Sequence, residues 1–370
     1  SVEPSSVIRR SVMRIGIIGL PRAGKSTVFS LLTGQSPPPA KGPAPTVGIA
    51  KVLEPRLDRL ASLFHPKKIT PVTLEVLDFP PLGRAGKDGD VEGSVLAELR
   101  QVDVILHVIR HFEDARVPHD EGALDPVRDL ALLDTLLLLA DLAVVEKRID
   151  RIADEVRKGQ KGEGHQEVPL LERCRGMLMK EQSLRLMALT AAEAKSLRGY
   201  ALLTLKPLLL LLNIGEERLG NADPVWARLQ EKAAAPRTGW CRLAAKTEWE
   251  LSRLPGEERQ EFSRALGLET LESPSVLRRC LDVMDLITFF TVVGEELRAW
   301  AIPRGATAVE AAGTIHTDMA RGFIKAEVIA LEDLEDAGSM AAARKQGRVR
   351  LEGKEYRVQD GDILTVRFSG

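Results

Sequence analysis

The chain has 370 residues, which is long enough for two or three domains with separate hydrophobic cores. Its 52 basic and 53 acidic residues give a formal net charge of −1, which excludes a chain-wide field that would by itself select nucleic acid or an anionic membrane. Three cysteines (Cys174, Cys241 and Cys280) lie far apart without the spacing of metal ligands, so we expect reduced thiols in a cytoplasmic protein.

Two apolar runs are too short or too interrupted to cross a membrane. Residues 136–145 contain Asp141, and residues 202–212 are broken by Lys206 and Pro207. Neither run reaches the roughly 20 apolar residues that a membrane-spanning helix needs. We therefore expect no membrane partner, and the absence of an apolar segment near the N-terminus predicts no secretory signal.

A phosphate-binding loop follows the first predicted strand. An apolar run at residues 13–18 predicts a buried strand, and residues 27–32 predict the start of a helix. Between them, residues 19–26 read Gly-Leu-Pro-Arg-Ala-Gly-Lys-Ser and fit the pattern G-x-x-x-x-G-K-[ST]. Backbone N–H groups and the helix N-terminus of such a loop hold a polyphosphate, the lysine reaches its outer phosphates, and the hydroxyl binds Mg²⁺. The predicted nucleoside triphosphate contacts are Gly19, Pro21, Arg22, Ala23, Gly24, Lys25, Ser26 and Thr27.

The rest of residues 12–125 continues as a parallel α/β nucleotide-binding domain. Further strands are expected at residues 73–77 and 104–109, with polar or glycine-rich connections between them. Asp78 ends the first of these strands, where a P-loop enzyme places an acidic group near the metal. The predicted Mg²⁺ ligands are therefore Ser26 and Asp78.

The residues after Asp78 depart from the usual hydrolytic arrangement. Pro80 and Pro81 have no backbone N–H to offer the γ-phosphate, and the apolar side chain of Leu82 cannot orient water. His119, in the loop after the next predicted strand, is the candidate imidazole for water activation, with a solvated histidine as the alternative. The predicted catalytic residues are His119, Arg22 and Lys25.

Helical sequence interrupts the α/β pattern over residues 126–200. Apolar residues between 138 and 156 recur at intervals of three and four, which predicts a coiled-coil seam on one long helix. A glycine-rich turn at residues 158–164 precedes a second helical stretch. We therefore expect an inserted antiparallel hairpin, which serves either as a packing arm or as a docking surface.

The α/β pattern returns over residues 201–285. An apolar strand at residues 207–212 leads into Asn213-Ile214-Gly215-Glu216, where switch GTPases use Asn-Lys-x-Asp and read guanine with the aspartate. The longer carboxylate of Glu216 cannot occupy the same place, so we expect ATP to be preferred over GTP. The predicted base-site residues are Asn213 and Glu216 on one side and Ala245 and Lys246 on the other.

Residues 286–370 predict a small separate α+β domain. Short strands recur with Gly and Asp turns, and Asp360-Gly361 between two alternating runs predicts a β-hairpin. A basic cluster at residues 344–350 is offset by acidic residues, so it argues only weakly for RNA binding.

In this order of features, the chain resembles the Obg-like ATPase family of the YchF type from about residue 13 onward. The resemblance is strongest in Pro55-Arg56-Leu57-Asp58, Pro66-Lys67-Lys68-Ile69, Phe112-Glu113-Asp114, Val145-Glu146-Lys147-Arg148 and Arg298-Ala299-Trp300, and in residues 312–318, 322–328 and 358–362. It implies a Ras-like P-loop domain, a coiled-coil arm and a C-terminal TGS domain of β-grasp type. It further implies slow ATP hydrolysis and ribosome association, and it places His119 where the family has a loop histidine proposed to assist hydrolysis.

Departures from the family wording gather around the γ-phosphate. The family's usual loop has Asn and Val where this chain has Arg22 and Ala23, and its first-switch Thr-Ile-Glu-Pro-Asn corresponds to residues 42–46 here, without the threonine at its usual place. In P-loop switches that have this asparagine, its amide helps to hold a potassium ion beside the phosphates. The Arg22 guanidinium would supply that charge permanently, or it points to solvent.

Two functional hypotheses follow from the sequence and the resemblance. The first is a monomeric, cytoplasmic, Mg²⁺-dependent nucleotide-binding protein that slowly hydrolyses ATP in preference to GTP and acts as a ribosome-associated switch. The alternative is a hydrolysis-deficient nucleotide-binding scaffold that docks to ribosome or RNA through the hairpin and the TGS domain.

Overall fold

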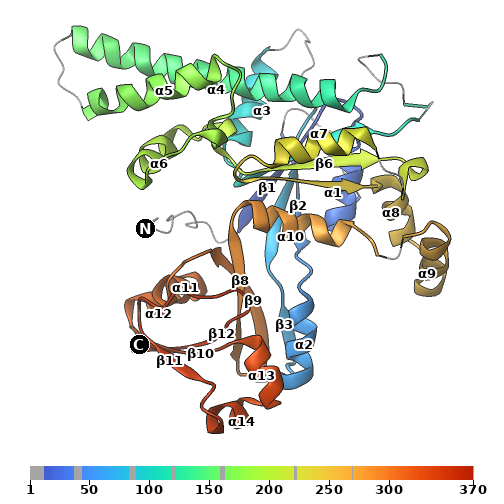
Figure 1. Cartoon of the computed structure of the whole chain (residues 1–370), viewed down its shortest axis with the longest axis vertical. Helices are drawn as coiled ribbons and strands as arrows, with labels where there is room; N and C mark the ends of the chain where they lie inside the picture. The colour runs from blue at the N-terminus through green and yellow to red at the C-terminus, as the bar shows by residue number, and fades with distance from the viewer. Residues whose placement is uncertain are drawn as a thin grey trace. The chain divides into compact units, whose positions relative to one another are not determined.

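The computed structural model describes residues 12–36, 44–82, 89–114, 116–117, 122–158, 163–220, 223–268 and 270–369 (Figure 1). Two compact units make up the chain. The nucleotide unit contains residues 13–50 and 75–276, and the C-terminal unit contains residues 51–74 and 277–370. The sequence did not predict that residues 51–74 group with the C-terminal sheet. The limits of the four predicted domains remain predictions.

A six-stranded sheet forms the centre of the nucleotide unit. Its order is β2-β4-β1-β5-β6-β7, and the pairs β1–β5, β5–β6 and β6–β7 are parallel. Every residue of β5 and β6 is buried, as is typical of the central strands of a parallel sheet. Strand β6 is almost wholly apolar, whereas β5 also buries His107, Arg110 and His111. The strands are β1 (Met13–Ile18), β2 (Thr46–Lys51), β4 (Thr73–Asp78), β5 (Val104–His111), β6 (Leu208–Ile214) and β7 (Thr238–Leu243).

Several helices of the nucleotide unit bury apolar side chains against the sheet or against each other. Leu99, Leu133 and Leu229, from α3, α4 and α7, join one hydrophobic cluster with strand residues of β5 and β6. The helices are α1 (Lys25–Thr33), α3 (Gly89–Leu99), α4 (Pro126–Arg157), α5 (Val168–Leu178), α6 (Ala191–Leu197), α7 (Pro224–Ala233), α8 (Ala245–Ser252) and α9 (Gly256–Ala265), with α10 (Ser273–Val283) running across the division between the units.

The predicted helical hairpin is confirmed. Helix α4 begins after Asp125, whose carboxylate caps the first turn by accepting hydrogen bonds from two backbone N–H groups. Val145 and Ile152, one heptad apart, are buried against Leu171 and Cys174 of α5, and the two helices lie side by side in Figure 1. Since the hairpin connects β5 to β6, which are neighbours in the sheet, it is an insertion that leaves the strand order intact.

His107 is a fully buried titratable group in the middle of β5. Its side chain is 1% exposed, and its Nδ1 has no hydrogen-bond partner among the described residues. Burial, helped by the positive charges of Lys232 and Lys25, lowers the pKa of His107 to about 3. The native sheet therefore holds this imidazole in its neutral form.

We expect His107 to weaken the fold in mild acid. Below pH 6.5 the unfolded chain protonates this histidine but the folded chain does not, so the free energy of unfolding falls by about 1.4 kcal/mol per pH unit down to the folded pKa of about 3. Denaturant unfolding should show wild type losing about 2–3 kcal/mol relative to His107→Gln between pH 7 and 4.5. Leu210→Val, at the neighbouring position in β6, is the non-titrating control. A constant difference between wild type and His107→Gln at all pH values would contradict this assignment.

The C-terminal unit contains a second six-stranded sheet, in the order β11-β10-β12-β8-β9-β3. Small helices cover its core, in which Phe289 and Phe323 pack with alanines of α11. The strands are β3 (Lys68–Thr70), β8 (Leu286–Val293), β9 (Glu296–Pro303), β10 (Phe323–Ile329), β11 (Arg350–Glu352) and β12 (Ile363–Phe368). The helices are α2 (Pro55–Phe64), α11 (Ala308–Ile315), α12 (Thr317–Arg321), α13 (Leu331–Ala337) and α14 (Met340–Lys345).

The β-hairpin predicted around Asp360-Gly361 is wrong. Strand β12 follows this turn and pairs with β10 and β8, whereas the residues before it form only an isolated bridge from Arg357 to Thr307. Side chains hold the turn instead, since Asp360 accepts the Thr288 N–H at 2.8 Å and Asp362 accepts the Gln359 N–H at 2.8 Å. A two-residue turn signal does not reveal that the second strand will pair elsewhere.

Charged side chains around the buried Glu54 fasten α2 to the C-terminal sheet. Arg56 donates to Glu54 at 2.6 Å and to Asp360 at 2.9 Å, and its guanidinium lies 5.3 Å from the centre of the Phe290 ring. Arg278 donates to the same glutamate at 3.2 Å. This network ties residues 51–74 to side chains more than 200 positions later in the chain, in keeping with the grouping of the segment in this unit.

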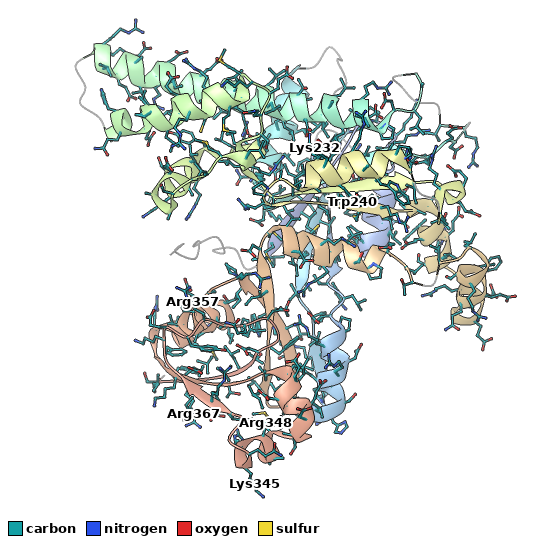
Figure 2. The ribbon with its side chains drawn as sticks, viewed as in Figure 1. Lys232, Trp240, Lys345, Arg348, Arg357 and Arg367 are labelled. Atoms are coloured by element: carbon teal, nitrogen blue, oxygen red, sulfur yellow. The ribbon has the colours of Figure 1, made fainter. Side chains whose placement is uncertain are left out.

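Carboxylates pair with most of the predicted basic cluster of the C-terminal unit, of which Figure 2 labels Lys345 and Arg348. Arg344 and Arg367 both pair with Glu327, and Arg348 pairs with Asp333 at 3.4 Å. Carboxylates already hold these guanidiniums, which keeps the case for RNA binding at this surface weak.

Candidate nucleotide-binding site

Two glycines allow the loop between β1 and α1 to approach other elements closely. A Cβ atom on Gly19 would lie 2.4 Å from the carbonyl oxygen of Val108 on β5. Gly24 has a left-handed φ of 92°, and a Cβ there would lie 2.2 Å from the Asn213 Nδ2. Arg22 also has a left-handed φ, of 60°. These conformations turn the chain sharply between strand and helix, as a phosphate-binding loop requires.

Lys25 starts α1 with a buried ammonium group. Its side chain is 6% exposed, and its Nζ donates to the carbonyl oxygens of Gly19 and Leu20, each at 3.1 Å. Burial lowers the pKa of Lys25 to about 8, against a smaller opposing effect of the Asp78 charge. The loop folds around this cation, which is therefore placed to meet an anion bound in the loop.

Ser26 and Asp78, the predicted metal ligands, meet at the carboxyl end of β4. The Ser26 hydroxyl donates to Asp78 Oδ2 at 2.7 Å. Burial raises the pKa of Asp78, while the hydrogen bond from Ser26 and the charge of Lys25 lower it. The second oxygen, Oδ1, is buried without a hydrogen-bond partner among the described residues. A desolvated carboxylate oxygen beside a hydroxyl fits Mg²⁺, which keeps several waters and uses one or two protein groups together with phosphates.

Larger groups of potential metal ligands are not found among the described residues. In the residues that the structure covers, no cluster of three or more His, Cys, Asp and Glu side chains could hold a metal ion. A fully protein-built metal centre is therefore not found there, and the Ser26–Asp78 pair is the group that fits a cation shared with phosphate.

Asn213 links the loop to the segment after β7. Its Nδ2 donates to the carbonyl oxygen of Ala23 at 3.0 Å, and its Oδ1 accepts the Ala245 N–H at 3.2 Å. The side chain is 4% exposed, so both hydrogen bonds are shielded from water. Asn213 thus joins three loops at the carboxyl ends of β1, β6 and β7, the edge where ligands bind in open α/β sheets.

The remaining predicted base-site residues surround this bridge. Glu216 is exposed and begins η5 (Glu216–Arg218), a single turn of 3-10 helix after β6. Ala245 is buried at the start of α8, and Lys246 is exposed next to it. The structure therefore brings Asn213 and Ala245 into contact and leaves two charged side chains in solvent at the base side.

For the other predicted site residues, the structure gives only their exposure or does not describe them. Arg22 is exposed, Pro21 and Thr27 are half-buried, and Ala23 is buried. His119 lies outside the described residues, as do the first-switch residues 42 and 43.

The segment after Asp78 turns its apolar side chains into the core. Phe79 and Leu82 are 2% and 1% exposed and belong to the cluster beneath the sheet, while Pro81 is exposed. Leu82 is therefore held away from water at the site. Thr46, the threonine closest to the missing switch residue, is the first residue of β2.

Sequence reasoning missed a polar network beside the base site. His111, at the end of β5, contacts Asp223 through its Nε2 at 2.6 Å, and Arg218 of η5 donates to the same carboxylate at 2.9 Å. The available signal was Asp223 before Pro224, which marks a helix N-cap. Nothing in the local sequence indicated that His111, 112 positions earlier, would join it.

Two family models and several known proteins match the chain. A family model described as a 50S ribosome-binding GTPase matches residues 14–141. A model of the C-terminal domain of YchF GTPases, described as a protein of unknown function, matches residues 286–369. The "Ribosome-binding ATPase YchF" of Bacillus subtilis (strain 168) is 38% identical over 363 residues, which cover 96% of this chain and 98% of that protein.

This chain belongs to the YchF family. The YchF protein of Escherichia coli O157:H7, also named a ribosome-binding ATPase, is 36% identical over 361 residues, covering 96% of this chain and 99% of its own. The solved YchF GTPase of Schizosaccharomyces pombe shares the fold with a TM-score of 0.82 at 27% identity, over 99% of this chain and 100% of that one. YchF membership confirms the predicted family and the predicted combination of P-loop domain, helical insertion and C-terminal sheet domain.

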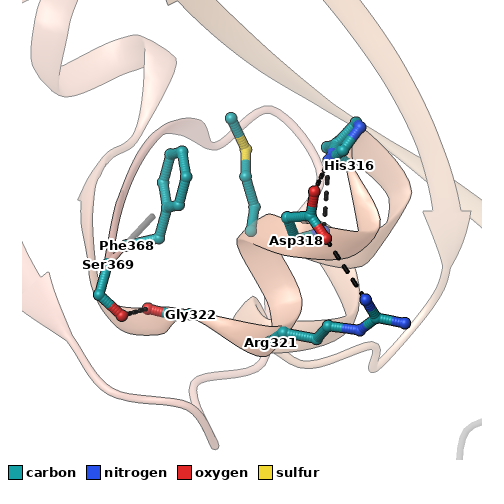
Figure 3. Close-up of a pocket in the computed structure, with 7 residues that line it drawn as sticks. His316, Asp318, Arg321, Gly322, Phe368 and Ser369 are labelled. Atoms are coloured by element: carbon teal, nitrogen blue, oxygen red, sulfur yellow. Dashed lines mark hydrogen bonds and ion pairs between the residues drawn. The ribbon is translucent and has the colours of Figure 1, made fainter.

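A groove on the C-terminal unit has none of the predicted nucleotide contacts among its lining residues (Figure 3). This groove of about 570 Å³ is lined by polar residues and Met319 of α12 and its flanks and by Phe368 and Ser369 at the end of β12. Asp318 lies 3.4 Å from His316 and 3.5 Å from Arg321, and Phe368 is 39% exposed. Since the Asp318 carboxylate lies beside the Arg321 guanidinium, the groove presents a balanced rather than a basic surface.

No helix among the described residues has both the length and the apolar character that crossing a bilayer requires.

Proposed function

We propose that this chain binds Mg²⁺-ATP in the nucleotide unit, hydrolyses it slowly and uses the nucleotide state to control an association with the ribosome. The observation that carries the proposal is the convergence of Lys25, Ser26 and Asp78 at one end of the sheet. An ammonium, a hydroxyl and a partly unsatisfied carboxylate are the groups that a metal-bound triphosphate needs. The proposed association with the ribosome rests on the relatives, which are named ribosome-binding ATPases.

The preference for ATP rests on Glu216. Adenine offers an amino group where guanine offers a carbonyl oxygen, and a carboxylate accepts a hydrogen bond from the first but repels the second. Its exposed position at the start of η5 leaves the carboxylate available to a base bound beside Asn213. The opposite wall would come from Ala245 and Lys246 at the start of α8.

Each group has a defined task in this proposal. Lys25 neutralises the outer phosphates, while Ser26 and Asp78 hold Mg²⁺, which supplies Lewis-acid polarisation of the phosphate oxygens when bound. His119 is proposed to accept a proton from the attacking water. Slow turnover follows because Pro80 and Pro81 offer no backbone N–H to the γ-phosphate. The same prolines favour the alternative of a nucleotide-binding scaffold that does not hydrolyse.

A paired titration tests the proposal. Binding of ATP and GTP is measured with Mg²⁺, phosphate release is followed in the same samples, and co-sedimentation with ribosomes is compared with ATP, with ADP and without nucleotide. ATP-selective binding with phosphate release and nucleotide-dependent co-sedimentation is the expected result. Binding without release would support the scaffold instead, and binding of neither nucleotide would overturn the proposal.

Nucleotide binding should take up protons in alkaline solution. The pKa of Lys25 in the free protein is about 8, and bound phosphates raise it again because they place negative charge against the ammonium. At pH 9, we expect uptake of about 0.9 proton and a dissociation constant about tenfold weaker than at pH 7. Calorimetry in two buffers of different ionisation enthalpy measures the uptake. A pH-independent affinity between pH 7 and 9.5 would refute this role of Lys25.

Hydrolysis should not depend on potassium. Arg22 is exposed on the phosphate-binding loop and carries a permanent positive charge, which would take the place of a bound monovalent cation. Turnover in KCl and NaCl of equal concentration should agree within about twofold, while Arg22→Asn should make turnover potassium-dependent. Wild-type activity that rises several-fold in potassium would defeat this idea.

A further inference from the structure

The proposed base-reading residue lies on a segment that is too short to hold itself in place. Two backbone hydrogen bonds close the η5 turn, from Arg218 N to the Gly215 carbonyl and from Leu219 N to the Glu216 carbonyl, both at 3.1 Å. A single 3-10 turn has poor hydrogen-bond geometry and depends on its surroundings for a fixed conformation. The direction in which Glu216 points therefore depends on an anchor outside the turn.

Arg218 provides such an anchor at the other end of η5. Its Nη1 donates to Asp223 Oδ2 at 2.9 Å, and this carboxylate is only 9% exposed. Asp223 is also the N-cap of α7, where its Oδ1 accepts the Val225 N–H at 2.9 Å. A charge-assisted hydrogen bond thus ties the turn to the start of a regular helix.

His111 holds the same carboxylate from the sheet. Its Nε2 donates to Asp223 Oδ2 at 2.6 Å, and its side chain is 6% exposed. In the pairing of β5 with β6, His111 lies opposite Ile214, the residue directly before Gly215. The contacts therefore form a closed ring that runs from β6 through η5, Arg218, Asp223 and His111 back to β6.

The charge state of Asp223 favours the contacts in this ring. Burial opposes ionisation of Asp223, but hydrogen bonds from His111 and the Val225 N–H, together with the charge of Arg218, hold the pKa of this carboxyl below its usual range. Asp223 is thus an anion at neutral pH and accepts from both of its side-chain partners. A buried carboxylate shared by two donors from different elements restricts both of them.

We propose that the Arg218–Asp223–His111 network positions Glu216 and thereby sets the preference for adenine over guanine nucleotides. The inference rests on the proposed function, in which Glu216 faces the base. The three network residues are positioning residues and do not touch the nucleotide. Without the anchor, η5 samples several directions, and the carboxylate discriminates less between an amino group and a carbonyl oxygen.

Arg218→Met is the informative variant because the side chain is 32% exposed and its removal leaves the β5 and α7 contacts in place. Dissociation constants are measured for Mg²⁺-ATP, Mg²⁺-GTP and inorganic tripolyphosphate, which has no base. We expect the ratio of GTP to ATP dissociation constants to fall about tenfold, with tripolyphosphate binding unchanged. Arg218→Lys should recover part of the ratio. Arg228→Met, the same change at a position within α7 rather than η5, should preserve it.

The possible results distinguish failure of this inference from failure of the proposed ATP preference. An ATP-selective wild type whose ratio is unchanged in Arg218→Met would overturn the inference alone. Equal losses for ATP and tripolyphosphate would also overturn it, because they would indicate damage to the phosphate site. A wild type that binds ATP and GTP equally would contradict the proposed ATP preference itself, before any variant is measured.

Discussion

Lys25→Met should lose Mg²⁺-ATP binding by at least about 100-fold, because the variant gives up a charge-assisted contact to the outer phosphates worth roughly 2–4 kcal/mol. The methionine has similar length and volume, so the loop keeps its packing. Titration with a fluorescent ATP analogue, followed by displacement with ATP, measures the loss. Binding within about threefold of wild type would show that this lysine does not meet the nucleotide.

The same variant should be more stable than wild type without nucleotide. Burial lowers the Lys25 pKa from 10.5 to about 8, which corresponds to roughly 3 kcal/mol of unfavourable energy for holding the charge in the fold. Loss of the two hydrogen bonds to Gly19 and Leu20 offsets part of this gain, so we expect urea unfolding to show a net stabilisation of about 1–2 kcal/mol. A destabilised variant would mean that the two hydrogen bonds outweigh the cost of burying the charge.

Gly24→Ala should damage both the fold and the site. The new Cβ would lie 2.2 Å from the Asn213 amide, and the residue would retain a φ of 92° that L side chains rarely adopt. Relief of the clash breaks the hydrogen bond from Asn213 to Ala23, so we expect a loss of about 3 kcal/mol of stability and at least tenfold weaker ATP binding. Thermal unfolding and nucleotide titration measure the two effects.

Gly34→Ala is the matched control for that substitution. Gly34 caps the other end of α1 with a φ of 70°, but a Cβ atom added there would have nothing within 4 Å. Its backbone strain is therefore comparable, at about 1 kcal/mol, while the site is untouched. Equal effects of the two substitutions on ATP binding would show that the contact between Gly24 and Asn213 has no part in the site.

Features set by neighbouring residues could be predicted from the sequence, whereas contacts between distant residues could not. Lys25 and Ser26 were identifiable because the phosphate-binding pattern is contiguous and lies between a strand and a helix. The hairpin helix α4 was identifiable from its apolar periodicity. Each of these features is determined within about 30 neighbouring residues, where spacing alone decides which side chains share a face.

Contacts between residues far apart in the chain could not be predicted from local spacing. Asp360 bonds to Thr288 and Arg56, so the expected β-hairpin gave way to a turn held by distant partners. His111 and Asp223 each look ordinary in their own segment and acquire a shared role only when β5 and α7 meet. Such contacts depend on which strands become neighbours, and local propensity carries little information about that choice.

The sequence by itself determined the chemistry that the protein brings to a nucleotide: a phosphate-binding loop, one acidic partner for Mg²⁺, and Asn213 followed by Glu216 for the base. Tertiary structure decided how these groups meet. Parallel strand order places the ends of β1, β4 and β6 at one edge, which brings Asp78 to Ser26 and lets Asn213 reach Ala23 from 190 positions away. The physical reason is that a residue type sets the possible chemistry of a side chain, whereas burial and strand pairing set its neighbours, its charge state and its direction.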